Sequence, residues 1–146
     1  DAVHENLFTA IKAGAASLPN LTIREDLPLS EVDRLMGQAK LFINTSTYEG
    51  FPNTFVQAAM RGAPIMSLTV DPDGVLSRHG IGLCAGGSFE RLVEATGQVC
   101  VSEPLWKNLS VRAQAYAREH HDLDRSVRGL KQLLYAMAGP SRRGAA

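Results

Sequence analysis

The stretch KLFINTSTYEGFPNTFVQAAMRGAPIMSL, residues 40 to 68, decides the fold of this chain. It opens with a short apolar run, as expected of a parallel strand that is covered on both faces. A polar loop follows and leads into a run with apolar residues at helical spacing. Gly62 and Pro64 end that helix, because glycine suits the left-handed position after a helix and proline cannot continue one. The stretch therefore predicts a strand, a loop, a helix and a second strand.

Strands and helices alternate along the rest of the chain. Apolar residues at helical spacing predict helices over 3–18, after Ser30 and after Ser88, and both serines suit the N-cap position. The segments PNLTIRE (19–25) and GIGLCAGG (80–87) are typical of short strands. Such alternation predicts an α/β fold, a Rossmann-like parallel sheet with helices on both faces.

Apolar stripes along the predicted helices indicate which faces are buried, since stripes of this kind are far more often core than binding surface. Five helices carry such a stripe. We expect these residues in the core: Val32, Leu35, Met36 and Ala39; Phe55, Val56, Ala59 and Met60; Phe89, Leu92, Val93 and Thr96; Trp106, Leu109, Ala113, Tyr116 and Ala117; Leu123, Val127, Leu130, Leu134 and Met137.

The composition is that of an ordinary globular domain. The 146 residues are enough for one domain with a real core, and 45% of them are hydrophobic. The 15 basic and 15 acidic side chains cancel, which argues against non-specific binding of nucleic acid. Cys84 and Cys100 are not spaced like metal ligands, so we interpret them as reduced core residues, with a disulfide as the weaker alternative. No apolar run approaches the ~20 residues that span a bilayer, and we expect a cytoplasmic protein.

The polar loop carries residues that suit a diphosphate sugar. Ligands of parallel α/β sheets bind beyond the carboxyl ends of the strands, where this loop is expected to lie. Backbone amides near Phe51, Asn53 and Thr54 would begin the helix without partners, which favours phosphate binding. Gly50 lets a ligand approach the backbone closely. Glu49 would repel phosphate but could accept hydrogen bonds from neutral sugar hydroxyls.

A simpler interpretation of the same residues stays open. Glu49 could serve only the helix dipole, and Gly50–Pro52 could be only a turn. Asn53 or Thr54 could be only a cap. Tyr48 either packs under the loop or stacks on a base.

The block LFINTSTYEGFPNTFVQAAMRGAPIMSL resembles the nucleotide-sugar-binding domain of glycosyltransferase group 1. These are retaining, B-type (GT-B), family 4-like enzymes with two Rossmann-like domains. The segment LPNLTIREDLPLSEVDRLMGQAK before the block and the segment VDPDGVLSRHGIGLCAGG after it also fit, as do the following helix and the two terminal helices. The resemblance therefore covers roughly residues 18–137. It implies that residues 1–138 are a partial C-terminal donor-binding domain, truncated at its N-terminus, followed by a disordered tail over 139–146.

In that family a Glu, seven further residues and a second Glu mark the donor site. The first Glu corresponds to Glu49, which the resemblance makes the catalytic-site acid that binds donor-sugar hydroxyls. The amides of Gly50 and Phe51 would face the sugar and phosphates. The second corresponds to Gln57, which is a departure, because a neutral amide accepts ribose hydroxyls more weakly than a carboxylate. Gln57 either still holds ribose, signals relaxed or lost donor binding, or is a solvated helix residue.

The site that the resemblance implies has one catalytic residue, Glu49, and a set of donor-binding residues around it. The donor-binding residues are Arg24, Tyr48, Gly50, Phe51, Pro52, Asn53, Thr54 and Gln57. Arg24 is included because it is expected at the carboxyl end of a strand, where the family packs the nucleobase. It is either a rim residue or simply exposed.

We expect no metal and no cofactor beyond the donor substrate, a nucleoside diphosphate sugar. The DPD at 71–73 resembles the acid-x-acid metal motif of another glycosyltransferase class, but its proline and following glycine favour a plain turn. His79 beside Arg78 could approach a donor phosphate, although a solvated loop pair is favoured. His120 and His121 lack two further ligands for a metal.

The function implied is donor binding within a retaining glycosyltransferase, of hexosyltransferase type, that moves a sugar to an acceptor hydroxyl. The family's Gly-rich loop with its Arg and Lys and its N-terminal acceptor domain have no counterpart here, so we expect the isolated chain to be inactive and to need that domain as a partner. The missing strands predict either a rearranged four-stranded sheet or a homo-oligomer through exposed strand edges. The full-length protein would be peripheral to the inner membrane if its acceptor is a lipid. The competing hypothesis is a non-catalytic nucleotide-binding or interaction module.

Overall fold

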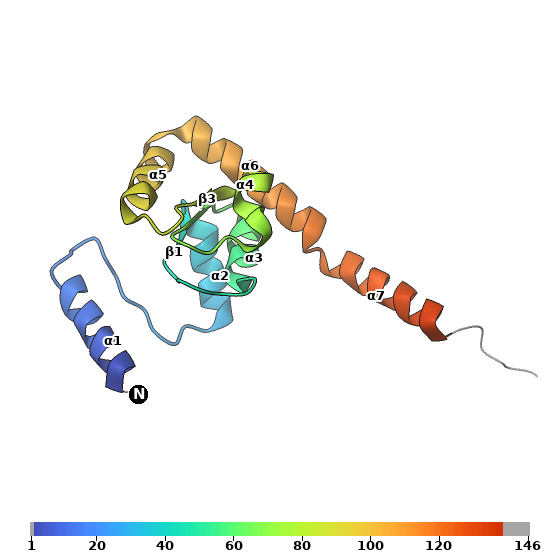
Figure 1. The fold of residues 1–146 in the computed structure, drawn as a ribbon, viewed down its shortest axis with the longest axis horizontal. Coiled ribbons are helices and arrows are strands. Elements are labelled where there is room, and N and C mark those ends of the chain that lie inside the picture. The colour runs from blue at the N-terminus through green and yellow to red at the C-terminus, as the bar shows by residue number, and fades with distance from the viewer. Residues whose placement is uncertain (1, 139–146) are drawn as a thin grey trace, which may run out of the picture. The chain divides into compact units, whose positions relative to one another are not determined.

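The computed structural model describes the backbone of residues 2–138 and the side chains of residues 6–138 (Figure 1). The chain separates into two compact units, Asp1–Val32 and Asp33–Ala146. The predicted tail over 139–146 lies outside the described residues, and the assignment of 1–138 to one donor-binding domain stays a prediction.

The first unit consists of helix α1 (Ala2–Ala15) and an irregular segment that leads into helix α2 (Leu29–Gln38). The predicted strand over 19–25 is wrong, because the segment makes no ladder and Leu21 is half exposed. A strand has no stability without a partner to accept its backbone hydrogen bonds. Instead, an ion pair of 2.6 Å between Lys12 Nζ and Glu25 Oε1 ties the segment to α1.

Helix α2 begins two residues earlier than expected. The amides of Glu31 and Val32 both donate to the carbonyl of Pro28, so Ser30 lies inside the helix and its predicted N-cap role is wrong. Asp33 of α2 forms a bidentate ion pair with Arg61 at the end of α3 (Asn53–Arg61), which links these two helices within the second unit.

The second unit is built on a three-stranded parallel sheet in the order β1 (Phe42–Asn44), β2 (Ile65–Ser67) and β3 (Gly82–Cys84). All three strands were predicted and are confirmed, although each is shorter than its apolar run. The four-stranded rearrangement is wrong for residues 2–138, because the segment that was to supply the fourth strand is irregular. Pairing with a second chain stays a prediction.

Helices cover both faces of the sheet, as the alternation of side chains shows. Phe42 and Ile65 are register partners and share one face, where the ring of Phe42 meets Phe55 of α3 edge-on at 6.3 Å. Met66 points to the opposite face. There it belongs to a buried cluster formed with Ala85, Leu92, Ala95 and Val99. The last three residues lie on α5 (Phe89–Val101), so α3 and α5 lie on opposite faces.

The helix ends follow capping rules that the sequence already indicates. Ser88 Oγ accepts the amide of Arg91 at the start of α5, as predicted. Gly62 ends α3 with φ 74°, a left-handed conformation that glycine adopts at no steric cost. The DPDG turn forms the short helix η1 (Pro72–Gly74), which leads into α4 (Val75–His79).

The predicted core stripes of the middle helices are right on α6 and partly wrong on α3 and α5. Helix α6 (Glu103–His120) buries Ala113, Tyr116 and Ala117 and packs against α3. On α5 the buried residues are Leu92, Ala95 and Val99, whereas Phe89 and Val93 are exposed. The face that α5 turns to the sheet therefore carries Ala95 and Val99 in place of Phe89 and Val93. On α3 the exposed residue of the predicted stripe is Met60.

Helix α7 (Leu123–Ala138) continues from the end of α6 and is amphipathic, but it buries none of its residues (Figure 1). The prediction that its stripe forms part of the core is therefore wrong. Both cysteines are free, as expected, but Cys100 is exposed, so its assignment to the core is also wrong. Within residues 2–138 we find no helix with the length and apolar character needed to cross a membrane.

Candidate functional site

The three parallel strands end in the same register row, which places their last residues along one edge of the sheet. Asn44, Ser67 and Cys84 are direct neighbours in this row. Asn44 is 6% exposed and Ser67 is fully buried. Ser67 Oγ has no hydrogen-bond partner within the described part of the chain. The polar loop leaves β1 from this carboxyl edge, as expected of a ligand site in a parallel sheet.

Asn44 holds Glu49 in place. Its amide Nδ2 donates to Glu49 Oε1 at 3.0 Å, and its Oδ1 accepts the backbone amide of Ser46 at 2.7 Å. Both ends of a buried side chain are thus used to shape the loop. Asn44 is not among the predicted site residues, although a polar residue that ends an apolar strand at the carboxyl edge is a signal for such a role.

Glu49 is half-buried and ionised. Hydrogen bonds from Ser46 and then Asn44 lower the pKa of Glu49 below its ordinary value and outweigh the opposing effect of desolvation. A carboxylate that is fixed and charged at neutral pH can accept further hydrogen bonds from hydroxyl groups. The helix-dipole interpretation of Glu49 is incomplete, because the side chain is bound by Asn44 at the end of β1.

Glu49 and Tyr48 line a shallow hollow of about 210 Å³ between the loop after β1 and the loop after β2. The other lining residues are Thr47, Thr69, Val70, Asp71 and Pro72. Tyr48 is 90% exposed, which excludes its packing under the loop. Asp71 Oδ1 accepts the amide of Leu76 at 2.9 Å, so this carboxylate has a structural partner.

The N-terminus of α3 lacks a side-chain cap. Pro52 precedes the helix with φ −67° and ψ 124°, so it occupies the cap position, although proline would also suit the first helical turn. The first backbone bond runs from the amide of Phe55 to the carbonyl of Pro52 at 3.0 Å. The alternative in which Asn53 or Thr54 caps α3 is therefore wrong. The first backbone amides of α3 therefore keep the partial positive charge that suits an anion.

Phe51 and Gln57 lie outside the hollow. The ring of Phe51 packs against the imidazole of His121 at 5.5 Å, at the end of α6. Gln57 is half-buried on α3, and its role as a ribose ligand stays a prediction.

Arg24 belongs to the first unit, where its Nη1 lies 3.2 Å from Glu31 Oε1. The strand that was to place Arg24 at the edge of the sheet does not form. The structural argument for Arg24 as a nucleobase contact is therefore lost.

A cluster of aromatic and imidazole rings lies beside Phe51. The ring of Tyr116 lies 4.6 Å from His79, 4.8 Å from His120 and 5.3 Å from His121. The Tyr116 hydroxyl lies 3.2 Å from His121 Nε2. His79 is thus part of a ring cluster at the end of α4 and not a loop residue, although it stays exposed as expected. The sequence gives no local signal for this cluster, because the cluster joins α4 and α6, which are far apart in the chain.

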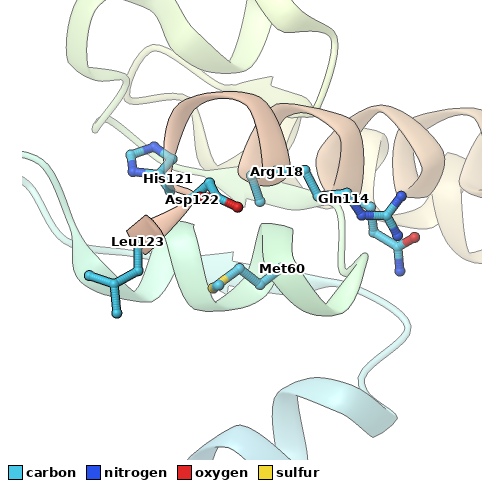
Figure 2. Close-up of a pocket in the computed structure, with 7 residues that line it drawn as sticks. Met60, Gln114, Arg118, His121, Asp122 and Leu123 are labelled. Atoms are coloured by element: carbon cyan, nitrogen blue, oxygen red, sulfur yellow. The ribbon is translucent and has the colours of Figure 1, made fainter. Parts of the chain in front are cut away.

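The end of α6 and the neighbouring face of α3 also form a groove of about 190 Å³ (Figure 2). Figure 2 shows Met60 of α3 facing Gln114, Arg118 and Asp122, with His121 at the end of the row. In the described part of the chain, no group of three or more His, Cys, Asp or Glu side chains is arranged to hold a metal ion.

Comparison with known proteins gave no match to a family model, a curated protein or a solved structure. The case for a function therefore depends on the geometry of the loop and the edge of the sheet.

Proposed function

We propose that this chain is the donor-binding part of a retaining glycosyltransferase of the GT-B type, which binds a nucleoside diphosphate sugar. The observation that supports this most is the pair Asn44–Glu49 beside the uncapped N-terminus of α3. A fixed carboxylate and an anion-binding helix end then stand on the same loop. These are the two kinds of group that a sugar joined to a diphosphate requires.

The diphosphate would lie at the start of α3. Backbone amides of Asn53 and Thr54 have no side-chain acceptor, and the helix dipole adds attraction for negative charge. Gly50 would permit close approach, since a side chain added there would meet nothing within 4 Å. In the transition state these amides would stabilise the charge that develops on the leaving diphosphate.

The sugar would lie at Glu49. The ionised carboxylate accepts hydrogen bonds from sugar hydroxyls, while Asn44 prevents it from swinging toward the phosphates. The leaving diphosphate would help to deprotonate the incoming acceptor hydroxyl on the same face of the sugar. Glu49 thus orients the donor and is not the base.

The hollow beside Glu49 is smaller than the ~300–1,000 Å³ typical of small-molecule sites, at about 210 Å³. It would enclose only part of a sugar nucleotide. This supports a site completed by an acceptor-binding domain, and we expect no measurable sugar transfer by the isolated chain.

A second candidate is a non-catalytic interaction module. The observation that favours it is α7, whose apolar stripe is exposed. Gln57 in place of the family's second Glu also weakens the expected grip on ribose.

A calorimetric titration with uridine and guanosine diphosphate sugars, and with the free diphosphates, tests the proposal. We expect the chain to prefer one diphosphate sugar over its free diphosphate, and Glu49→Gln to remove that preference with an affinity loss of about ten- to a hundred-fold. Glu90→Gln is the matched control, because Glu90 is also an acid whose pKa is lowered by hydrogen bonds, here from its own backbone and Ser88 at the start of α5.

Two results would contradict the donor site. One is equal affinity of wild type and Glu49→Gln for the sugar nucleotide. The other is an absence of saturable binding at millimolar ligand, which favours the interaction module.

A further inference from the structure

We propose that His121 is a positioning residue for the donor loop, because its ring fixes Phe51 and its protonation releases that contact. The inference deepens the proposed function and depends on it only for the ligand, since the loop contact exists without one. Phe51 stands between Gly50 and Pro52, so the contact sets the turn that presents the first amides of α3.

The loop is anchored at two points of different chemistry. Asn44 holds Glu49 by a hydrogen bond of 3.0 Å, and His121 packs on Phe51 with ring centroids 5.5 Å apart. Between these anchors lies only Gly50, which offers no steric restraint of its own. Losing either anchor frees the turn, and the entropy of ordering it would then oppose ligand binding.

The His121 ring is itself fixed by α6. Its Nε2 lies 3.2 Å from the Tyr116 hydroxyl, and Tyr116 is buried. Tyr116 in turn meets His79 of α4 and His120. A chain of ring contacts therefore connects the packed core of α6 to the exposed loop.

Protonation would weaken this arrangement. Burial, and secondarily the neighbouring His120, lower the pKa of His121 below its ordinary value of 6.5. The imidazole is therefore neutral at pH 7. A base whose folded-state pKa is lowered gives stability that is present above the unfolded pKa and lost as the pH falls through the folded pKa.

The charged groups around the cluster come from α4, from α6 and from the connection between α6 and α7. Arg78 precedes His79 on α4. On α6, the Glu119 carboxylate lies 3.9 Å from His120 Nε2, and Arg118 lines the same groove as His121. Asp122 follows His121 and lines that groove too, but its Oδ1 accepts the amide of Arg125 at 2.6 Å at the start of α7.

Amide ¹H–¹⁵N spectra of the unliganded chain between pH 5 and 8 test the positioning role. We expect the amides of Gly50 and Phe51 to titrate with a midpoint below 6.5, the ordinary value for His121. His121→Phe keeps a ring against Phe51 and should abolish that titration. His120→Gln removes the like-charged neighbour and should raise the midpoint toward 6.5.

A loop that does not titrate in wild type, or that still titrates in His121→Phe, would overturn the proposal. This arm contains no ligand, so it decides the role of His121 even if the donor proposal fails. A second arm measures affinity for the preferred diphosphate sugar. Its diphosphate is esterified at both ends and stays ionised throughout this pH range. We expect affinity to fall roughly fivefold from pH 7.5 to 5.5 in wild type and to stay constant in His121→Phe.

Discussion

Helices α3 and α7 are both amphipathic, but they have opposite surroundings. Phe55 of α3 is 2% exposed, whereas every residue of the α7 stripe is at least 40% exposed. Helix α3 leaves β1 and returns to β2 through Gly62, which keeps it against the sheet and α6. Helix α7 follows α6 after only His121 and Asp122, and none of its own residues is buried. An amphipathic pattern thus shows which face of a helix needs cover, and the connection decides whether the chain itself supplies it.

The largest effect is expected from placing a side chain where the sheet allows none. A Cβ added at Gly82 would lie 1.9 Å from the backbone oxygen of Ile65. Gly82→Ala must therefore separate β3 from β2, and we expect a loss of at least about 4 kcal/mol of unfolding free energy in chemical denaturation. Gly129→Ala in α7 is the contrasting variant, since nothing lies within 4 Å and alanine favours a helix by about 1 kcal/mol. Comparable losses of unfolding free energy in both variants would contradict the distinction between the packed sheet and the exposed α7.

The direct comparison of the two helices is a pair of truncations. Phe55→Ala should cost about 3–5 kcal/mol, because it leaves a cavity against Phe42. Leu130→Ala in α7 should change stability by less than about 0.5 kcal/mol in dilute monomer, because that side chain is exposed. A cost above 2 kcal/mol for Leu130→Ala would show that something covers α7 in solution, and sedimentation would then reveal whether it is a second copy.

Removing the buried amide of the candidate site should have an intermediate effect. Asn44→Ala breaks two hydrogen bonds and should cost about 1–3 kcal/mol, while Asn53→Ala, at an exposed position that caps nothing, should cost less than about 0.5 kcal/mol. The substitution should also raise the pKa of Glu49 toward its ordinary value of 4.5.

The sign of the pH effect follows from that shift. A carboxyl with a lowered folded-state pKa gives stability that is present above the unfolded value and lost as the pH falls through the folded value. The wild-type protein should therefore lose more stability than Asn44→Ala just below pH 4.5, the ordinary value for Glu49. Parallel pH profiles would show that Asn44 does not hold the carboxylate.

The smallest effects concern the helix caps. Ser88 Oγ caps α5 against the core, so Ser88→Ala should lower the global stability by about 1 kcal/mol. Asp122 caps α7 at 2.6 Å from the amide of Arg125, and Asp122→Ala should reduce the helical circular dichroism signal with little change in the denaturation midpoint of the core. If each variant changed the circular dichroism signal and the denaturation midpoint equally, α7 would unfold together with the core.

Local signals in the sequence predicted much of the fold. The three strands, the cap at Ser88 and the stop at Gly62 each have a signal in neighbouring residues, and these predictions are confirmed. The prediction of a strand through Leu21 failed, because a strand also needs a distant partner. The composition of the segment does not reveal whether one exists. The prediction that the α7 stripe is buried failed for the same reason, because burial also needs a distant partner.

The candidate site was predictable only in part. The position of the loop at the carboxyl edge follows from alternating strands and helices, and the structure bears it out. The contact of Asn44 with Glu49 is a matter of side-chain direction within one loop, and the contact of His79 with Tyr116 joins separate helices. Neither contact leaves a spacing pattern in the sequence.

Trp106, the one tryptophan of the chain, donates its indole N–H to the carbonyl of Lys40 at 2.6 Å, just before β1. Its fluorescence is thus a natural reporter of the seam where α6 meets the beginning of the sheet, without any added dye. Since α1 and α7 hold no tryptophan, a melting curve recorded by Trp106 fluorescence follows the layers around the sheet, and a mismatch with the ellipticity curve reports separate melting of α1 or α7.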